Sequence, residues 1–454
     1  MHRWIRATLV GMGLLLGAQP AVAVNYVYIL TGQSNSLGAV KGSPATAEQL
    51  ARYASEGRLW SGNMVRDTGK PFDASPSWKK VQPQLPEYNG SLCMGPEYGF
   101  AHIMQRHGWH TAGRDCVCVI KASLDGGGNT FWTPGKPAYI TLSNTVKNGL
   151  AALQGQTHVS ALLYLQGESD KGEEISRAPV RFAELKARLQ KEVKKGLKYA
   201  VVGECATWHG KDAKDASGNT TAQLMHAFSQ KKKDIGWVRT RDLTKITSGD
   251  SMGVHYDGIS QISIGARYAY AVALLEKLPL GFVRGDAPQA PLDSAAAWWG
   301  NKAPKEGDVI SWDVSSYRGA ESLHKNMAVG GLVVEDPVAG VVEIAASAGC
   351  ELQVGAQGIE LKEGDLTLHL PLVTAEAQTW TLAGGRTLKL KALKGKGTIT
   401  LQAPEDAALE LELEKAPLQS WVLPEKCPQV KATIGGKPAH FVKRNEVYKL
   451  EPQS

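Results

Sequence analysis

The sequence YVYILTGQSN at residues 26–35 begins with a short, mostly apolar run and ends in a polar turn. Short apolar runs of this kind are typical of strands that are covered on both faces of a sheet. Four further runs along the chain have the same character, at 116–122, 161–165, 199–205 and 237–243. We therefore expect a sheet whose strands are buried on both sides.

Segments with helical periodicity separate these runs across residues 24–280. They span 140–153, 179–198, 220–233 and 260–278. The alternation of strands and helices predicts a parallel sheet in a three-layer α/β/α domain. Ligands of such domains bind beyond the carboxyl ends of the strands, so we expect polar residues that follow strands to converge there.

The character of the sequence changes after residue 280. A segment rich in Pro and Gly at 281–291 is expected to be a linker. Apolar residues then recur with period two, and glycine pairs separate the runs, which predicts an all-β accessory domain over 292–454. The clearest such runs are 366–370, 387–393, 398–401 and 409–413. No repeat is strict enough to indicate a solenoid from spacing alone.

The composition is that of a folded globular protein. Of 454 residues, 43% are hydrophobic and 21% are charged, which excludes wholesale disorder. The net charge is +7, and no basic block is interleaved with aromatic residues. Nucleic acid is therefore not an expected partner.

The first 23 residues have the features of a signal peptide. A basic start precedes an apolar segment at 7–18 that is too short to span a membrane, and AVA at 21–23 fits a cleavage site. We expect a secreted or periplasmic protein without a membrane span, in which disulfides are permitted. Cys116 and Cys118 are expected to face opposite ways on their strand and not to pair.

The turn after the first run presents Ser34 two residues after Gly32. A serine at the end of a strand can project its hydroxyl at the sheet edge, where free backbone N–H groups can bind an anion. The alternative is an ordinary strand-to-helix turn in which Ser34 or Asn35 caps the helix.

A second polar turn follows the run at 161–165 and reads QGESD. The amide of Gln166 could donate to a developing oxyanion. Glu168 and Asp170 could act as acid and base, but carboxylates that accept backbone N–H bonds and fix the loop fit this position better.

A third group surrounds His255, which lies just before the last helix. A histidine in a loop after the final strand is well placed to be a general base. Asp250 lies five residues upstream and could orient the imidazole ring. The order Ser, Asp, His is not diagnostic by itself, because triads recur in several orders.

Together these motifs resemble those of the SGNH hydrolase superfamily, in the branch of carbohydrate acetylesterases that includes sialate O-acetylesterases and acetyl xylan esterases. The resemblance covers about residues 24–280 and implies a flavodoxin-like three-layer domain. It rests on motifs in a fixed order: GQSN at 32–35, GPEYGF at 95–100, KA at 121–122, GGG at 126–128 with Trp132 and Pro134, QGESD at 166–170, and His255 before GARYA at 265–269.

The resemblance implies a role for each matching residue. Ser34 would be the nucleophile and His255 the general base. The oxyanion hole would be formed by the backbone N–H groups of Ser34 and Gly95 and by the side chain of Gln166. Gln33, Asn35 and Glu168 would support these groups.

The acid of the triad is the point where this sequence departs from the family pattern. The acid usually lies three residues before the histidine, and that position here is Met252. Asp250 is therefore the first candidate and Asp257 the second, and a Ser–His dyad is the third possibility.

The implied activity is hydrolysis of O-acetyl esters on carbohydrates through an acyl-enzyme, with no metal or cofactor. Two alternatives stay open: a non-catalytic glycan-binding or surface protein, and a lipase or thioesterase on the same fold. The sequence does not indicate which sugar is the substrate. Residues 378–401 also resemble autotransporter-associated β-strand repeats, which occur in large exported bacterial proteins.

Overall fold

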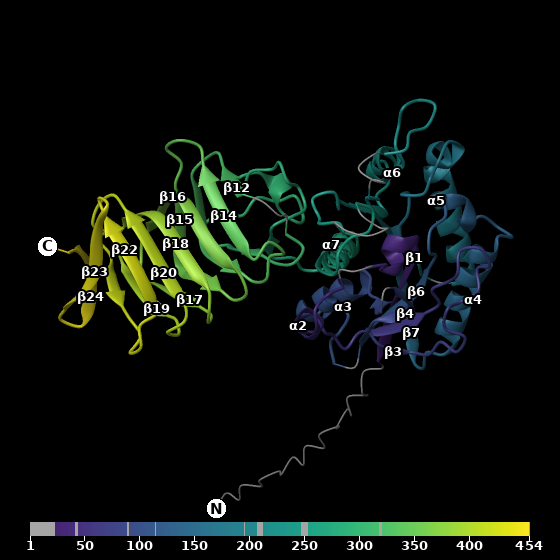
Figure 1. Cartoon of the computed structure of the whole chain (residues 1–454), viewed down its shortest axis with the longest axis horizontal. Helices are drawn as coiled ribbons and strands as arrows, with labels where there is room; N and C mark the ends of the chain where they lie inside the picture. Colours follow the sequence, from purple (N-terminus) through teal and green to yellow (C-terminus); the bar gives the residue numbers. More distant parts are fainter. Residues whose placement is uncertain are drawn as a thin grey trace, which may run out of the picture.

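The computed structural model describes residues 23–40, 44–88, 90–113, 115–194, 196–206, 212–246, 253–316 and 320–453. Residues 1–22 of the expected signal peptide lie outside this part of the chain. Figure 1 shows an α/β domain at one end of the molecule and a β domain at the other.

The α/β domain is built on a seven-stranded sheet in the order β3-β2-β6-β1-β7-β8-β9, in which every neighbouring pair is parallel except β2–β3. This confirms the predicted α/β domain with a mainly parallel sheet. Its strands are β1 (Val24–Gly32), β2 (Arg58–Ser61), β3 (Lys79–Lys80), β6 (Cys116–Ser123), β7 (Gln156–Leu165), β8 (Tyr199–Gly203) and β9 (Ile235–Val238).

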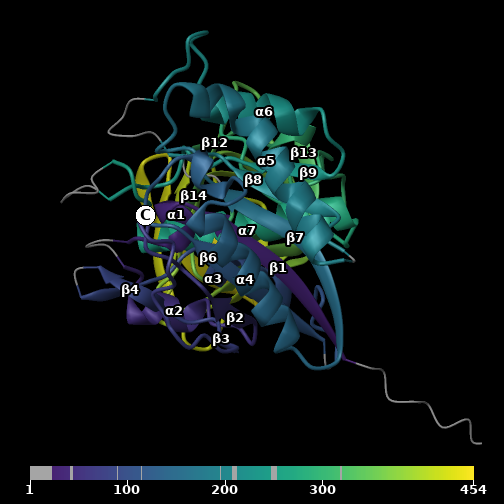
Figure 2. The same cartoon turned by 90° about the vertical axis from the view of Figure 1, so that its right-hand side faces the viewer.

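Helices cover both faces of this sheet because the side chains of each strand alternate between two hydrophobic cores. Tyr28 and Leu30 of β1 belong to the core beneath α3 (Glu97–Arg106) and α7 (Gly258–Glu276). Val27 and Ile29 belong to the other core, which lies beneath α4 (Pro137–Ala151), α5 (Glu173–Glu192) and α6 (Thr221–Gln230). Figure 1 shows β1, β6 and β7 between α3 and α7 on one side and α4 and α5 on the other, and Figure 2 views the molecule from the α4 and α5 side.

Several helical boundaries differ from the expected ones. Helix α5 begins at Glu173, six residues before Pro179, because two glutamates in its first turn favour the start there. Helix α3 was not expected. The remaining small elements are α1 (Ser34–Leu37), α2 (Ala47–Arg52), the hairpin β4 (Gln84–Tyr88) and β5 (Ser91–Cys93), and η1 (Asn129–Trp132). None of the helices in the described residues has both the length and the apolar character needed to cross a membrane.

The β domain winds as a parallel coil with two rows of strands. Within each row a strand pairs in parallel with the strand after next, so successive strands alternate between the rows. Trp380 pairs with Leu401, 21 residues later, and Leu366 pairs with Leu388, 22 residues later. This solenoid is a more specific architecture than the all-β domain expected from the sequence.

One row of the coil contains β11 (Val309–Trp312), β13 (Met327–Val334), β15 (Leu352–Leu361), β17 (Gln378–Leu382), β19 (Thr398–Gln402) and β21 (Ser420–Val422). The other contains β12 (Ala320–Leu323), β14 (Val341–Ala346), β16 (Asp365–Thr374), β18 (Thr387–Gly395), β20 (Ala408–Leu413) and β22 (Gln429–Ile434). Apolar side chains of both rows form a single core that includes Trp380 and Trp421. Their indole rings meet edge to face with centroids 5.3 Å apart.

Antiparallel strands close the C-terminal end of the coil. Strand β22 pairs with β23 (Lys437–Arg444), which pairs with β24 (Val447–Pro452), and β24 contacts β21 of the opposite row. The last parallel strands therefore have antiparallel neighbours. A terminal unit of this kind is what solenoid proteins need to cover their final repeat.

Two expectations differ from the structure in detail. The segment 281–291, expected as a linker, contributes β10 (Phe282–Val283), which pairs with β11 of the β domain. Cys116 and Cys118 lie on the same face of β6 with their Sγ atoms 3.8 Å apart, so the expectation that they face opposite ways was wrong. Residues i and i+2 of a strand share a face. Both cysteines have free thiols in the structure.

Candidate active site

Ser34 lies at the start of the four-residue helix α1, directly after the central strand β1. The turn depends on Gly32, which has φ of +138°, and a Cβ atom there would lie 1.9 Å from the carbonyl oxygen of Leu165. Only glycine permits this close approach of β1 and β7. The approach brings the two polar turns that follow these strands together, and Ser34 is 3% exposed.

The side chain of Gln33 joins these two turns. Its Oε1 atom accepts hydrogen bonds from Gln166 Nε2 at 2.9 Å and from the backbone N–H groups of Gly167 and Ser169, both at 3.2 Å. Gln33 is fully buried, so these bonds are shielded from water. The turn after β7 is thus fixed against the turn that contains Ser34.

Gln166 has partners on both ends of its amide. Its Oε1 accepts from the indole N–H of Trp132 at 3.0 Å, which orients the amide. Its Nε2 donates to Gln33 Oε1 and to the carbonyl oxygen of Gly127 at 3.0 Å. Both N–H groups of Gln166 therefore have protein acceptors, and its role as an oxyanion donor stays a prediction.

Asn35 connects the Ser34 turn with the segment that contains His255. Its Nδ2 donates to the carbonyl oxygen of Val254 at 3.1 Å, and its Oδ1 accepts from the backbone N–H of Tyr256 at 3.2 Å. One side chain thus holds the residues on both sides of His255. The structure brings the predicted nucleophile and the predicted base to the same edge of the sheet, with His255 7% exposed.

Two buried carboxylates hold the loops around this edge. Glu168 Oε1 accepts from Asn35 Nδ2 at 2.8 Å and from the backbone N–H of Ala206 at 3.0 Å, and burial raises the pKa of Glu168. Asp170 accepts from the backbone N–H of Asn129 at 2.8 Å. Burial raises the pKa of Asp170 to about 6. Each carboxylate accepts a backbone N–H, as expected for groups that fix loops.

A buried ion pair lies beside Gly95. Lys121 Nζ is 2.8 Å from Glu97 Oε2, and both side chains are fully buried. Lys121 also donates to the carbonyl oxygen of Leu37 in α1 at 2.9 Å. Glu97 Oε1 accepts from the backbone N–H of Gly95 at 2.9 Å. The pair therefore holds both α1 and the Gly95 turn, and the predicted oxyanion donor Gly95 has an acceptor of its own.

The structure describes only one of the two candidate acids of the triad. Asp250 lies outside the described residues. Asp257 is the N-cap of α7, where its Oδ1 accepts from the backbone N–H of Ser260 at 2.9 Å. This contact gives Asp257 a supporting role at the start of the helix that follows His255.

Pocket size does not identify this site. A pocket of about 810 Å³ opens near the amino end of β6 and is lined by residues such as Arg58, Trp78 and Cys116. The polar motifs lie at the opposite, carboxyl ends of the strands. Within the described ranges, no group of three or more His, Cys, Asp or Glu side chains could hold a metal ion.

Sequence reasoning did not find every residue that shapes the site. Glu97 and Lys121 lie in quoted motifs, but no charge pair was expected between them. Arg267 and Asp242, which form a buried pair with atoms 2.6 Å apart, were not singled out. The available indication was a charged residue within an apolar element, since Lys121 interrupts a strand and Arg267 interrupts a helix whose residues 260–273 are all buried.

Comparison with known families gives a match over most of the α/β domain. The family model described as carbohydrate esterase, sialic acid-specific acetylesterase matches residues 24–274. No curated protein matches the chain.

Two solved structures resemble the chain weakly. A protein from Arabidopsis thaliana is 16% identical, with a TM-score of 0.39, and the similarity covers 55% of this chain and 97% of that one. A structure titled NanS is 13% identical, with a TM-score of 0.43, and the similarity covers 57% of this chain and all of that one.

Proposed function

Because the chain belongs to the carbohydrate esterase family of sialic acid-specific acetylesterases, we propose that it is a secreted or periplasmic serine esterase. It removes O-acetyl groups from carbohydrates, as a sialate O-acetylesterase does, through an acyl-enzyme on Ser34. The fold we propose for residues 24–280 is that of the SGNH hydrolases.

The observation that carries this proposal is the position of Asn35. It follows the proposed nucleophile in the chain, and its amide contacts the backbone on both sides of the proposed base. A nucleophile and a base from distant parts of the chain are thereby held at the carboxyl ends of the strands, where α/β domains bind ligands.

In the proposed mechanism, His255 takes the proton of the Ser34 hydroxyl while Oγ forms a bond to the acetyl carbonyl carbon. The tetrahedral intermediate breaks the bond between that carbon and the sugar oxygen, and His255 returns the proton to the leaving alkoxide. Water then attacks the acetyl-Ser34 ester with His255 again acting as base, which releases acetate and restores the serine.

The oxyanion in this mechanism is stabilised by the backbone N–H of Ser34, that of Gly95 and the amide of Gln166. To donate to the substrate oxygen, the backbone N–H of Gly95 would give up its hydrogen bond to Glu97. The amide of Gln166 would likewise give up its hydrogen bond to the Gly127 carbonyl. One such donor contributes roughly 3 kcal/mol of transition-state stabilisation. Asp250 is our first choice for the acid that orients His255.

The test is acetate release from an aryl acetate and from a panel of O-acetylated sialic acid, xylan and pectin. We expect wild type to be active and both Ser34→Ala and His255→Ala to lose at least about 10³-fold in kcat. Comparing Asp250→Asn with Asp257→Asn identifies the acid, because only the true acid changes kcat strongly.

A long-chain aryl ester included in the panel separates a carbohydrate esterase from a lipase on the same fold. Preference for the long-chain ester would contradict the proposed substrate class. An inactive wild type across the whole panel, or full activity of Ser34→Ala, would contradict the proposed chemistry.

A further inference from the structure

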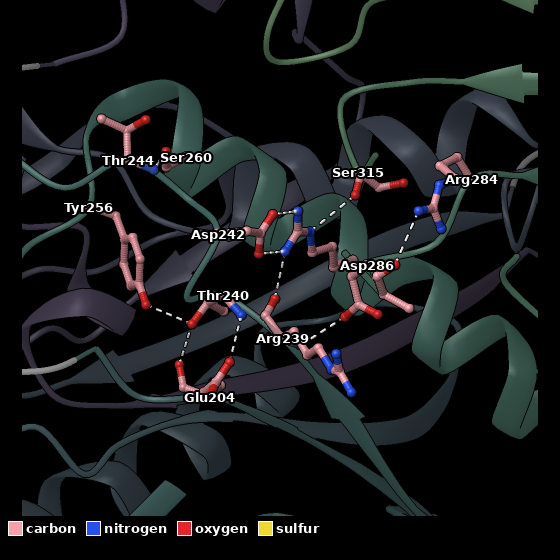
Figure 3. A network of polar contacts seen from close by, with 12 residues as sticks. Glu204, Arg239, Thr240, Asp242, Thr244, Tyr256, Ser260, Arg284, Asp286 and Ser315 are labelled. Carbon is pink, nitrogen blue, oxygen red and sulfur yellow. Dashed lines mark hydrogen bonds and ion pairs between the residues drawn. The ribbon is translucent and has the colours of Figure 1, made fainter. Parts of the chain in front are cut away.

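Arg267 lies on α7 with a fully buried side chain and contacts two separate segments of the chain, one that contains Arg239 and Asp242 and one that contains Ser315. Its Nη1 and Nη2 atoms donate to the two oxygens of Asp242 at 2.7 and 2.6 Å. Nη1 also donates to the carbonyl oxygen of Arg239 at 2.7 Å, and Nε donates to that of Ser315 at 3.0 Å. Figure 3 labels the three residues that accept these bonds, Asp242, Arg239 and Ser315.

The backbone of His255 and its neighbours is hydrogen-bonded to the segment that begins at Asp242. The backbone N–H of Ile246 donates to the carbonyl oxygen of His255 at 2.8 Å, and that of Asp257 donates to the carbonyl oxygen of Thr244 at 3.2 Å. Lys245 and Tyr256 form an antiparallel bridge between these bonds. Residues 244–246 thus provide a short ladder for the backbone of His255 and its neighbours.

A second set of contacts fastens the same ladder to the end of β8. Tyr256 Oη is 2.6 Å from Thr240 Oγ1, which is 2.6 Å from the carbonyl oxygen of Glu204 (Figure 3). Thr240 lies two residues before Asp242. Both sets of contacts therefore meet in the segment 240–246, and the Arg267 pair fixes its start.

The third contact of Arg267 extends this arrangement into the β domain. Ser315 belongs to a buried turn after β11, and Asp313 of that turn accepts a hydrogen bond from Tyr270 Oη at 2.6 Å. Tyr270 lies one helical turn after Arg267, so both side chains leave the same face of α7. Figure 1 shows α7 on the side of the α/β domain that faces the β domain.

We propose that Arg267 is a positioning residue for His255, and that through Ser315 the β domain takes part in holding the proposed active site. This rests on the proposed function. A bidentate bond between two buried charged groups has a fixed geometry, so Asp242 and the ladder that follows it have a single position relative to α7. Loss of that bond displaces the ladder, and the His255 imidazole moves with it.

The chain provides a matched control pair in the β domain. Arg284 is 1% exposed, donates to Glu321 at 2.8 Å and, like Arg267, also donates to backbone carbonyl groups. It is also buried and ion-paired, but its side chain donates to Glu321 and to the carbonyl oxygens of Ala297, Ala287 and Ala290, none of which lies in residues 240–257. Arg284→Lys and Glu321→Gln therefore report the general cost of disturbing a buried pair.

The experiment compares Arg267→Lys and Asp242→Asn with these controls in the full-length chain. We expect both test variants to lower kcat on an aryl acetate by at least about tenfold with KM changed less, since small misplacements of a catalytic group are costly. At the same loss of thermal midpoint, the controls keep kcat within about twofold. Asp242→Asn keeps the size of the side chain and serves if Arg267→Lys fails to fold.

Amide hydrogen exchange over residues 253–257 provides a measurement that is independent of activity. We expect faster exchange there in Arg267→Lys and Asp242→Asn and unchanged exchange in the controls. If wild type cleaves no ester but this pattern is found, the proposed function fails while the positioning of the His255 segment stands. Equal exchange in test and control variants, or equal losses of kcat, would overturn the inference.

Discussion

Replacing Lys121 with methionine tests whether the buried ion pair beside Gly95 holds the site together. Lys121 Nζ and Glu97 Oε2 are 2.8 Å apart and neither side chain is exposed. At an effective dielectric constant of about 20, two unit charges at this separation attract by about 6 kcal/mol, which offsets part of the cost of removing both from water. Lys121→Met removes the attraction and leaves the carboxylate of Glu97 buried without its cation.

We expect Lys121→Met to lower the free energy of unfolding by about 3–5 kcal/mol, the usual cost of removing one partner of a buried pair. The double variant Lys121→Met with Glu97→Gln removes both charges. We expect its loss of unfolding free energy to be smaller than the sum of the losses of the two single variants by at least about 1 kcal/mol. Because Lys121 also donates to Leu37 O and Glu97 accepts from Gly95, kcat should fall in the folded protein.

Urea unfolding of wild type, Lys121→Met, Glu97→Gln and the double variant, followed by far-UV circular dichroism and by intrinsic fluorescence, measures these free energies. Lys80→Met is the control, because Lys80 and Glu56 form an ion pair of 2.6 Å whose side chains are 62% and 75% exposed. Exposed pairs contribute at most about 1 kcal/mol. If Lys121→Met costs no more than Lys80→Met, or if the two single losses simply add, the reasoning from burial is wrong.

Three further predictions concern the site and its surroundings. Asn35→Ala should lower kcat about hundredfold by releasing the backbone around His255. Its control is Asn25→Ala, which removes two hydrogen bonds to backbone carbonyls at the other end of β1 and should change only stability. Steady-state kinetics of both variants decide this. Gly32→Ala should prevent stable folding, because its Cβ would lie 1.9 Å from Leu165 O. Gly218 also has a positive φ, of +81°, but open space around it, so Gly218→Ala should lower the free energy of unfolding by only about 1–2 kcal/mol. Thermal midpoints that fall equally in the two variants would contradict this. Burial and the neighbouring Asp313 raise the pKa of Asp336 to about 7, so the folded state binds the Asp336 proton more tightly than the unfolded state does. The stability that this proton gives is lost as pH rises from about 4 to 7. Asp336→Asn should flatten that decline in a series of thermal midpoints, and an unchanged pH dependence would refute this prediction.

Most of the strands and helices that surround the site, though not α3, could be predicted because their sequence patterns are local. The buried run at 26–31 and the glycine turn after it lie where β1 and α1 are found. Gln33 and Asn35 were expected as supporting residues, and both connect the Ser34 turn to distant loops. Their partners could not be predicted, because each contact joins segments more than 130 residues apart.

The coiled architecture of the β domain could not be read from the same patterns. Alternating apolar residues show that a strand has one buried face, but they are the same for parallel and antiparallel pairing. The spacing of 21 or 22 residues becomes visible only when Leu366, Leu388 and Leu409 are placed in register. Arg267 was missed for a related reason, since its acceptors lie in two segments distant from it in the sequence, one with Arg239 and Asp242 and one with Ser315.

The closed end of the coil has a consequence for how this protein can change its length. Because β22, β23 and β24 cover the last coil, a duplicated unit of about 21 residues can be accommodated only between coils that already exist. Each added coil would lengthen the domain by one strand spacing, about 4.8 Å, and would leave both ends unchanged. The distance between the proposed active site and the C-terminus can therefore grow in evolution by fixed steps, while the turn at Ser315 keeps its contact with α7.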